Sequence, residues 1–200
     1  MISEDICFLN KWMEIKSDNN VIENIFTIRE GENAIITFKN NDSVDNGIIK
    51  VNNANRLHRL MIETIPGCDY VLQSNLFWCS IWASLGESIP PLNAFHCRNF
   101  FGEVPCTKEL TVNQIEDDYS KIVFEQLKML YEKRFPYKMS AALIFKQGGI
   151  FWGNNLNEVV EYAICIEEIA KQAYMIRNLC GVSVKYMSYE LMEKLYKGEI

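Results

Sequence analysis

The residues best suited to chemistry stand next to one another in one short segment, His96-Cys97-Arg98. A histidine, whose unperturbed pKa is near 6.5, is a candidate general base, and an arginine can bind an anionic ligand or pair with a carboxylate. Residues 89–106 are rich in proline, aromatic residues and glycine, so we expect an irregular, extended backbone here. Adjacent side chains then point to opposite sides, which makes a nucleophilic Cys97–His96 pair geometrically poor. A structural hydrogen bond is the simpler role for His96, and a salt bridge or subunit contact for Arg98.

The other histidine and the cysteines favour structural roles. His58 falls in a predicted helix over residues 56–65, where a packed or solvent-facing ring is the simpler interpretation. The seven cysteines are an odd number at wide, irregular spacing, and no CxxC pair occurs, which removes the usual zinc-finger and thioredoxin-like interpretations. We therefore expect reduced, mostly buried thiols in a cytoplasmic protein.

The overall composition predicts a single globular domain over residues 1–200. Apolar residues make up 48% and charged residues 23% of the chain, as in ordinary globular proteins. The net charge of −6 argues against a nucleic-acid or anionic-membrane partner, because such surfaces need a basic field. The N-terminus lacks a signal-peptide pattern, and no apolar run approaches the roughly 18 residues of a membrane span.

Periodicity and capping residues predict elements of both kinds, without a strict βαβ rhythm. Helices are expected at residues 3–16, 56–65, 78–85, 111–134, 155–178 and 188–196. Strands are expected at residues 25–29, 34–38, 69–74 and 141–145. The apolar run 141–145 reads as a central strand, and the polar stretch 30–33 reads as a hairpin turn between the first two strands.

Several sequence clusters, in one order and at one spacing, resemble the class II aldolase and adducin-head superfamily, and within it L-ribulose-5-phosphate 4-epimerase. The clusters are His58-Arg-Leu60, Ile81-Trp-Ala83, Ser88-Ile-Pro90, His96, Phe100-Phe-Gly102, Val104-Pro-Cys-Thr107, Phe151-Trp-Gly153 and Glu167-Glu168. The similarity extends over residues 57–176. It implies an αβα sandwich with a mostly antiparallel central sheet, commonly assembled as a four-fold tetramer.

The metal site that the resemblance implies has lost its ligands in this sequence. Members of the superfamily hold a divalent metal, usually zinc, through a His-x-His pair and a later histidine ahead of a glycine. Those positions carry Gln73, Asn75 and Gln147 here, and an acidic position of the family falls on Ala54. A carboxamide is neutral and a far weaker ligand for a transition metal than an imidazole. We expect no metal and no cofactor.

The acid/base aspartate of the family falls on Arg98, a fixed cation. Gln73, Asn75 and Gln147 should cluster, either as drifted residues filling a redundant pocket or as a hydrogen-bonding site for a different small molecule. The bulky Trp78 beside them could fill that pocket. The first hypothesis is therefore a metal-free, catalytically degenerate homologue that acts as a scaffold or regulatory subunit, in a homo-oligomer or with an active paralogue. The alternative is a repurposed metal-independent enzyme acting on an anionic small molecule in the old inter-subunit cleft, with Gln73, Asn75, His96, Arg98 and Gln147 as ligand-binding residues.

Overall fold

The protein, as a computed structural model, is described over residues 24–30, 34–39, 55–180 and 184–200. The predicted helix at residues 3–16, the turn at residues 31–33 and Ala54 lie outside these ranges. Among the described residues, no helix is both long and apolar enough to cross a membrane.

The centre of the molecule is a five-stranded sheet in which every neighbouring pair is antiparallel. The strands are β1 (Asn24–Glu30), β2 (Ala34–Lys39), β3 (Tyr70–Ser74), β4 (Ala141–Ile144) and β5 (Gly148–Gly153), in the order β2-β1-β3-β5-β4. The first two strands pair along their whole length, as the predicted hairpin requires. Strand β5 is buried throughout, which is why its apolar residues run continuously instead of alternating.

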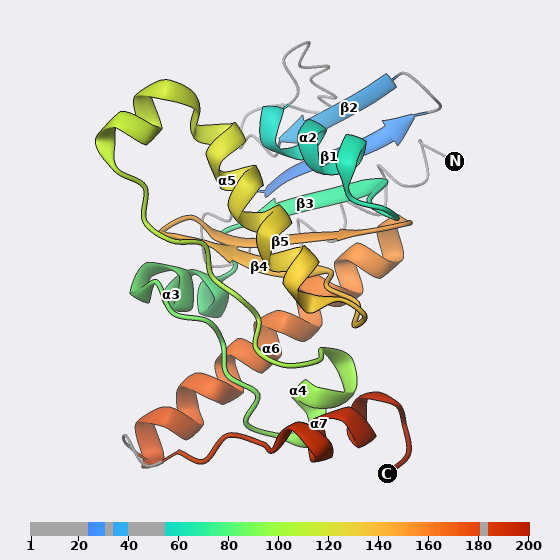
Figure 1. The fold of residues 1–200 in the computed structure, drawn as a ribbon, viewed down its shortest axis with the longest axis vertical. Helices are drawn as coiled ribbons and strands as arrows, with labels where there is room; N and C mark the ends of the chain where they lie inside the picture. The colour runs from blue at the N-terminus through green and yellow to red at the C-terminus, as the bar shows by residue number, and fades with distance from the viewer. Residues whose placement is uncertain (1–23, 31–33, 40–54, 181–183) are drawn as a thin grey trace, which may run out of the picture.

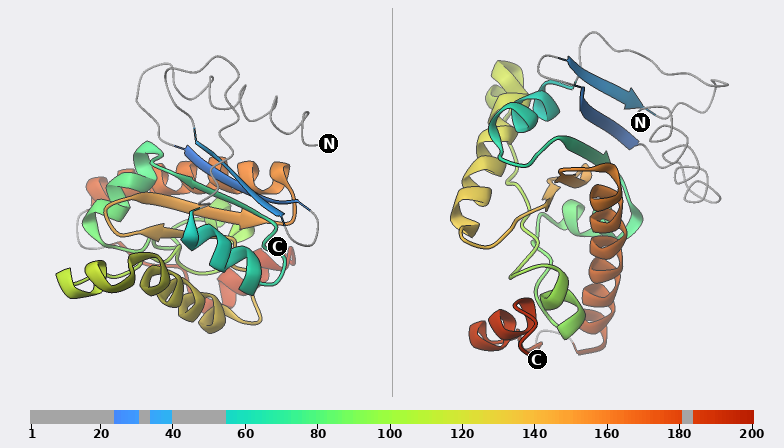
Figure 2. Two further views of the ribbon diagram at one scale, coloured as in Figure 1. Left: turned by 90° about the horizontal axis from the view of Figure 1, so that it is seen from above. Right: turned by 90° about the vertical axis from the view of Figure 1, so that its right-hand side faces the viewer.

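Helices cover both faces of this sheet (Figures 1 and 2). On one face lie α2 (Arg56–Thr64) and α5 (Val112–Arg134), which pack against each other. On the other face lie α3 (Phe77–Leu85) and the long α6 (Leu156–Cys180), while the short helices α4 (Ala94–Asn99) and α7 (Tyr189–Tyr196) pack together at the foot of the molecule. The predicted αβα sandwich with an antiparallel central sheet is confirmed.

Several helices begin at a residue whose side chain caps the first turn. The Asn55 side chain accepts a hydrogen bond from Leu57 N, and Thr111 with Gln114 forms a complete capping box at the start of α5. At the start of α6, Asn155 Oδ1 accepts from Glu158 N at 2.9 Å. These side chains satisfy amide groups that have no partner inside the helix, so local chemistry sets the helix starts.

The prediction of a central strand at residues 141–145 is wrong, because β4 lies at the edge of the sheet. Its residues are nevertheless all buried, since the segment before Thr107 covers the open edge. Leu143 N donates to Pro105 O at 2.7 Å, and Thr107 N donates to Leu143 O at 2.9 Å. An edge strand covered in this way has the continuous apolar sequence of a central one.

The expectation of irregular structure over residues 89–106 is also corrected, because this stretch contains α4. The Asn93 side chain accepts a hydrogen bond from His96 N at 2.8 Å and starts the helix. A helix of six residues gives too little periodicity to stand out among prolines and aromatic residues. His96 and Cys97 are both buried in this helix, so the argument from an extended backbone does not apply to them.

Candidate functional site

Two of the predicted site residues are in direct contact at one end of the sheet. Gln73 is on β3, and Gln147 is in the tight turn between β4 and β5. The pairing of Ser74 with Gly149 brings that turn beside β3, and Gln73 Nε2 donates to Gln147 Oε1 at 3.0 Å. The sheet register therefore joins residues 74 positions apart in the sequence.

The third amide, Asn75, follows β3 directly and lies against the same turn. Gly148 has a φ of +120°, and a Cβ built there would come within 2.9 Å of Asn75 Cα and 2.5 Å of the Ser74 carbonyl oxygen. Only glycine fits this approach, so Gly148 sets how closely the turn packs on β3. The predicted clustering of Gln73, Asn75 and Gln147 thus agrees with the geometry of the turn.

A helix cap fixes the direction of the amide network. Asn55 Oδ1 accepts from Leu57 N at 3.1 Å, which turns its Nδ2 toward Gln73 Oε1 at 3.5 Å. Gln73 must then present Nε2 to Gln147, whose own Nε2 is left facing outward with no partner among the described residues. The amide oxygens and nitrogens are assigned by this chain of partners. The outer end of the network is a hydrogen-bond donor.

His58 lies next to Gln73 and is fully buried. Its Nδ1 is 2.8 Å from Thr27 Oγ1 of β1, while Nε2 makes no hydrogen bond of normal geometry. Burial lowers the pKa of His58 to about 3, and the nearby Gln73 side chain opposes this shift only in part. The ring is therefore neutral and holds α2 against β1.

His96 and Arg98 do not join the amides within one chain. Both are on α4, which lies at the foot of the molecule, away from the sheet (Figure 1). His96 is buried, its Nε2 is 2.7 Å from Gly102 O, and burial lowers its pKa to about 4. This geometry matches the structural role that was the simpler interpretation for His96. Arg98 is exposed, and no carboxylate of the described residues forms an ion pair with it.

The residues present at the implied metal position do not fit a transition metal. The donors in contact there are neutral carboxamides, and Gln73 uses its oxygen and nitrogen for hydrogen bonds to Asn55 and Gln147. In the part of the chain that the structure describes, no three His, Cys, Asp or Glu side chains group closely enough to hold a metal ion. A stable zinc site needs imidazole, thiolate or carboxylate donors in such a group.

Glu167 caps the N-terminal end of α3, which lies beside this site. This role was not predicted from the sequence. Its two carboxylate oxygens accept hydrogen bonds from Trp78 N at 2.8 Å and Cys79 N at 3.0 Å. The cap residue of α3, Leu76, has no side chain able to accept them. The absence of a polar cap before residues 77–85 was the available signal. Since a carboxylate already occupies these donors, α3 offers no free N-terminus to an anionic ligand.

Trp78 does not lie fully inside the core. It is half-buried, and its ring packs against Tyr174 of α6 at 5.3 Å and edge-on against Phe77 at 5.0 Å between ring centroids. Trp82, one turn later, is buried and donates from Nε1 to Ala170 O at 2.9 Å. These contacts pack α3 against α6.

Comparison with known proteins identifies the fold and its relatives. Residues 20–174 match the Class II Aldolase and Adducin N-terminal domain family. The L-ribulose-5-phosphate 4-epimerase UlaF of Salmonella paratyphi C (strain RKS4594) is 26% identical over 126 residues, 61% of this chain and 54% of the relative. The chain thus spans about half the length of the curated relatives it matches.

Solved structures agree on the fold. An L-fuculose 1-phosphate aldolase superposes with a TM-score of 0.69 at 14% identity, covering 98% of this chain and 94% of that one. The L-fuculose-1-phosphate aldolase of Thermus thermophilus superposes with a TM-score of 0.63 at 12% identity, covering 92% of this chain and 100% of that one. With more than half of its residues matched by the family, this chain belongs to the class II aldolase and adducin N-terminal domain family.

Proposed function

We propose that this chain is a metal-free, catalytically degenerate member of its family that acts as a non-catalytic scaffold or regulatory subunit. The observation that carries the proposal is the hydrogen bond between Gln73 and Gln147, at two of the positions where the resemblance implies metal-binding histidines. Carboxamides that pair with each other leave neither a negative charge nor a lone-pair cluster for a metal. Chemistry that depends on polarising a sugar-phosphate oxygen loses its electrophile.

A second argument concerns anionic substrates. The alternative, a repurposed enzyme for an anionic small molecule, needs cationic or donor groups that converge on one place. Arg98 is on α4 at the foot of the molecule, and the amide donors at the start of α3 are occupied by Glu167. The outward Nε2 of Gln147 is a single neutral donor, which is too little to bind an anion on its own. The scaffold proposal is therefore the better supported of the two.

The decisive experiment measures metal content and turnover in the protein purified without chelators. We expect substoichiometric zinc and manganese by elemental analysis, and no conversion of L-ribulose 5-phosphate or L-fuculose 1-phosphate, the compounds after which its relatives are named. The matched control is the triple variant Gln73→His/Asn75→His/Gln147→His, which should gain zinc in the same preparation. Stoichiometric metal in the unmodified protein, or turnover of either compound, would contradict the proposal.

The partner of such a scaffold is a second copy of this chain or an active paralogue. Native mass spectrometry of the chain alone, and of the chain with an active class II aldolase from the same source, separates the two. A homo-oligomer in the first sample supports self-association. A mixed oligomer in the second sample, with altered turnover by the active partner, supports regulation. Strictly monomeric chains in both samples contradict a scaffold role.

A further inference from the structure

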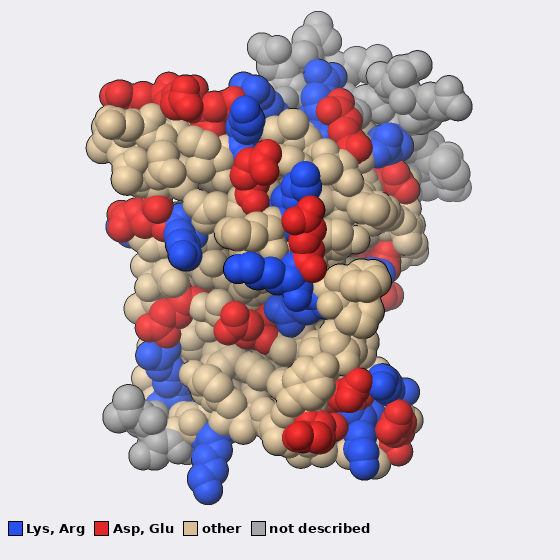
Figure 3. Space-filling view, viewed as in Figure 1, with Lys and Arg blue, Asp and Glu red and all other residues tan. Residues whose placement is uncertain are grey.

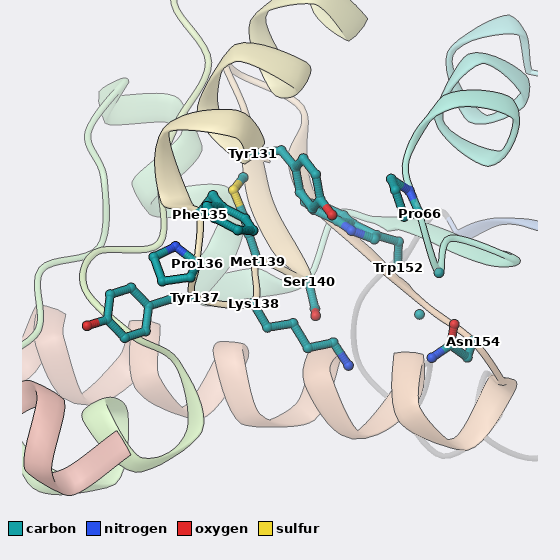
Figure 4. A pocket seen from close by; sticks show the side chains of 12 residues that line it. Pro66, Tyr131, Phe135, Pro136, Tyr137, Lys138, Met139, Ser140, Trp152 and Asn154 are labelled. Carbon is teal, nitrogen blue, oxygen red and sulfur yellow. The ribbon is translucent and has the colours of Figure 1, made fainter. Parts of the chain in front are cut away.

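A pocket lies at the far end of β5 from the amide network. Its volume is about 300 Å³, and it opens between the C-terminal end of α5, the segment before β4 and the turn at Pro66-Gly67 (Figure 4). Gln147 precedes β5 and Asn154 follows it, so the two sites are about 20 Å apart along the strand.

The wall of the pocket is mainly aromatic. Trp152 of β5 forms the buried floor, with 2% of its surface exposed, and Tyr131 of α5 lies over it (Figure 4). Phe135 stands at the rim with 85% of its surface exposed, and Pro136 follows it. Such rings offer a flat apolar surface to a ligand at low cost in conformational entropy.

Three polar groups in the pocket have no hydrogen-bond partner among the described residues. Ser140 is only 3% exposed, and its hydroxyl points into the cavity (Figure 4). The Tyr131 hydroxyl and the Asn154 carboxamide border the same space. The Ser140 hydroxyl faces the cavity without a bond to another described side chain, so it is a group that a ligand can satisfy.

The charge in the pocket lining is already paired. Among the described residues, Lys138 is the only charged residue in the lining, and its ammonium group forms an ion pair with Glu158 and lies 5.2 Å from the Tyr162 ring centroid. A phosphate or carboxylate entering here would have to compete with Glu158 for that ammonium group. The free groups are two hydroxyls and a carboxamide, each of which both donates and accepts.

We propose that this pocket binds a neutral small molecule that has one ring-sized apolar face and hydroxyl or amide groups along its edge. The apolar face packs on the rings of Tyr131 and Phe135 above the buried Trp152, and the edge bonds to the hydroxyls of Ser140 and Tyr131 and to Asn154. Two kinds of compound share this chemistry, a free cyclic sugar and a nucleoside base. The inference rests on neither the absence of a metal nor the scaffold proposal, since none of these residues belongs to the amide network.

The test is titration of the full chain with D-glucose and with adenosine, followed by saturation-transfer NMR and isothermal calorimetry. We expect at least one of them to bind, and D-glucose 6-phosphate or AMP to bind no more tightly than its neutral counterpart. Tyr131→Phe removes one hydroxyl without changing the ring and should weaken binding about five- to tenfold. Tyr131→Phe/Ser140→Ala should weaken it further, while the matched control Tyr119→Phe, on the same helix outside the pocket, should leave it unchanged.

The outcome of these titrations either identifies the type of ligand or contradicts the proposed binding site. Binding of D-glucose alone indicates a sugar, and binding of adenosine alone indicates a heteroaromatic base. The proposal is overturned if neither neutral compound binds or if Tyr131→Phe binds as the unmodified chain does. Tighter binding of a phosphorylated counterpart would also overturn it. Circular dichroism of each variant verifies that it is folded, and Tyr131→Phe keeps the packing of the ring.

Discussion

Gln73 and Gln147 illustrate how residue type decides what a site can do. Each carboxamide has a donor and an acceptor, so two of them can satisfy each other, and Asn55 extends the chain to a helix cap. Neutral imidazoles that converge through their acceptor nitrogens would need a metal ion or a proton between them. The carboxamides at positions 73 and 147 therefore form a hydrogen-bond chain that runs from the helix cap at Asn55 to the outer amide group of Gln147.

The two buried histidines predict how stability depends on pH. In the folded protein the pKa is about 3 for His58 and about 4 for His96, below the value of about 6.5 expected when unfolded. Below pH 6.5 the unfolded chain thus binds more protons than the folded chain. The free energy of unfolding therefore decreases as the pH is lowered, by up to about 1.4 kcal/mol per pH unit for each histidine. Urea unfolding between pH 7 and 5 measures this slope.

The pH prediction has an internal control. His58→Gln removes one of the two titrating rings, so the slope between pH 6.5 and 5 should fall by about half. The carboxylates that begin to titrate near pH 5 are the same in both proteins, so the difference between the two slopes isolates His58. A stability that is constant or rises on acidification to pH 5 would contradict the neutral, buried state of both rings.

Glu167 predicts a second effect at the level of one residue. Glu167→Gln keeps the size of the side chain but replaces a charged acceptor of two backbone hydrogen bonds with a neutral one. We expect a loss of about 1–3 kcal/mol in the free energy of unfolding, measured with urea. The control Glu161→Gln, exposed on the same helix, should change it by less than about 0.5 kcal/mol. Equal effects of the two substitutions would argue against the capping role.

At the level of elements, the covered edge of β4 shows how the fold protects an apolar strand. The segment ending at Thr107 pairs with Leu143, so the edge offers few free hydrogen-bonding groups to another chain. Thr107 is buried, and its hydroxyl also accepts a hydrogen bond from Phe145 N at 3.0 Å. One threonine thus joins the covering segment to the end of the strand.

This arrangement predicts the effect of Thr107→Val, which preserves shape and removes the hydroxyl. Phe145 N would lose its acceptor, with an expected cost of about 1–3 kcal/mol in the free energy of unfolding. Thr64→Val, at an exposed position on α2, is the matched control and should be near neutral. Thermal and urea unfolding of both variants measure the difference. A Thr107→Val protein as stable as the control variant would show that the hydroxyl contributes nothing.

At the level of the whole molecule, the surface combines interspersed charges with exposed apolar side chains. Figure 3 shows acidic and basic groups alternating over one face, without a large region of a single sign. On α3, Phe77 is 54% and Leu85 is 55% exposed, although both are large and apolar. Exposed apolar side chains also occur on α5, so α3 is one candidate contact surface between subunits, and the variants below test it.

We therefore predict that the chain self-associates through α3. Light scattering after size exclusion should give a mass above the 23.2 kDa of one chain, and Phe77→Ser/Leu85→Ser should shift it toward the monomer. Val112 at the start of α5 is 69% exposed, so Val112→Ser is the control and should leave the mass unchanged. A double variant that keeps the mass of the unmodified chain would place the interface elsewhere.

The sequence by itself determined the elements whose signals are local. The caps Thr111 and Asn155 set the starts of two helices, because each satisfies amide groups within three residues of itself. The sequence also determined that positions 73 and 147 carry neutral carboxamides, which are weak ligands for a transition metal. The sequence motifs also identified the family to which the chain belongs.

Only the tertiary structure decided what depends on pairing between distant segments. The edge position of β4 follows from its pairing with β5 alone, and the cap of α3 comes from Glu167 on another helix. The separation of His96 and Arg98 from the amides follows from α4 packing at the foot of the molecule. Such contacts leave no periodic or local pattern, since they join residues that are far apart along the chain and meet only when the sheet and its helical layers form.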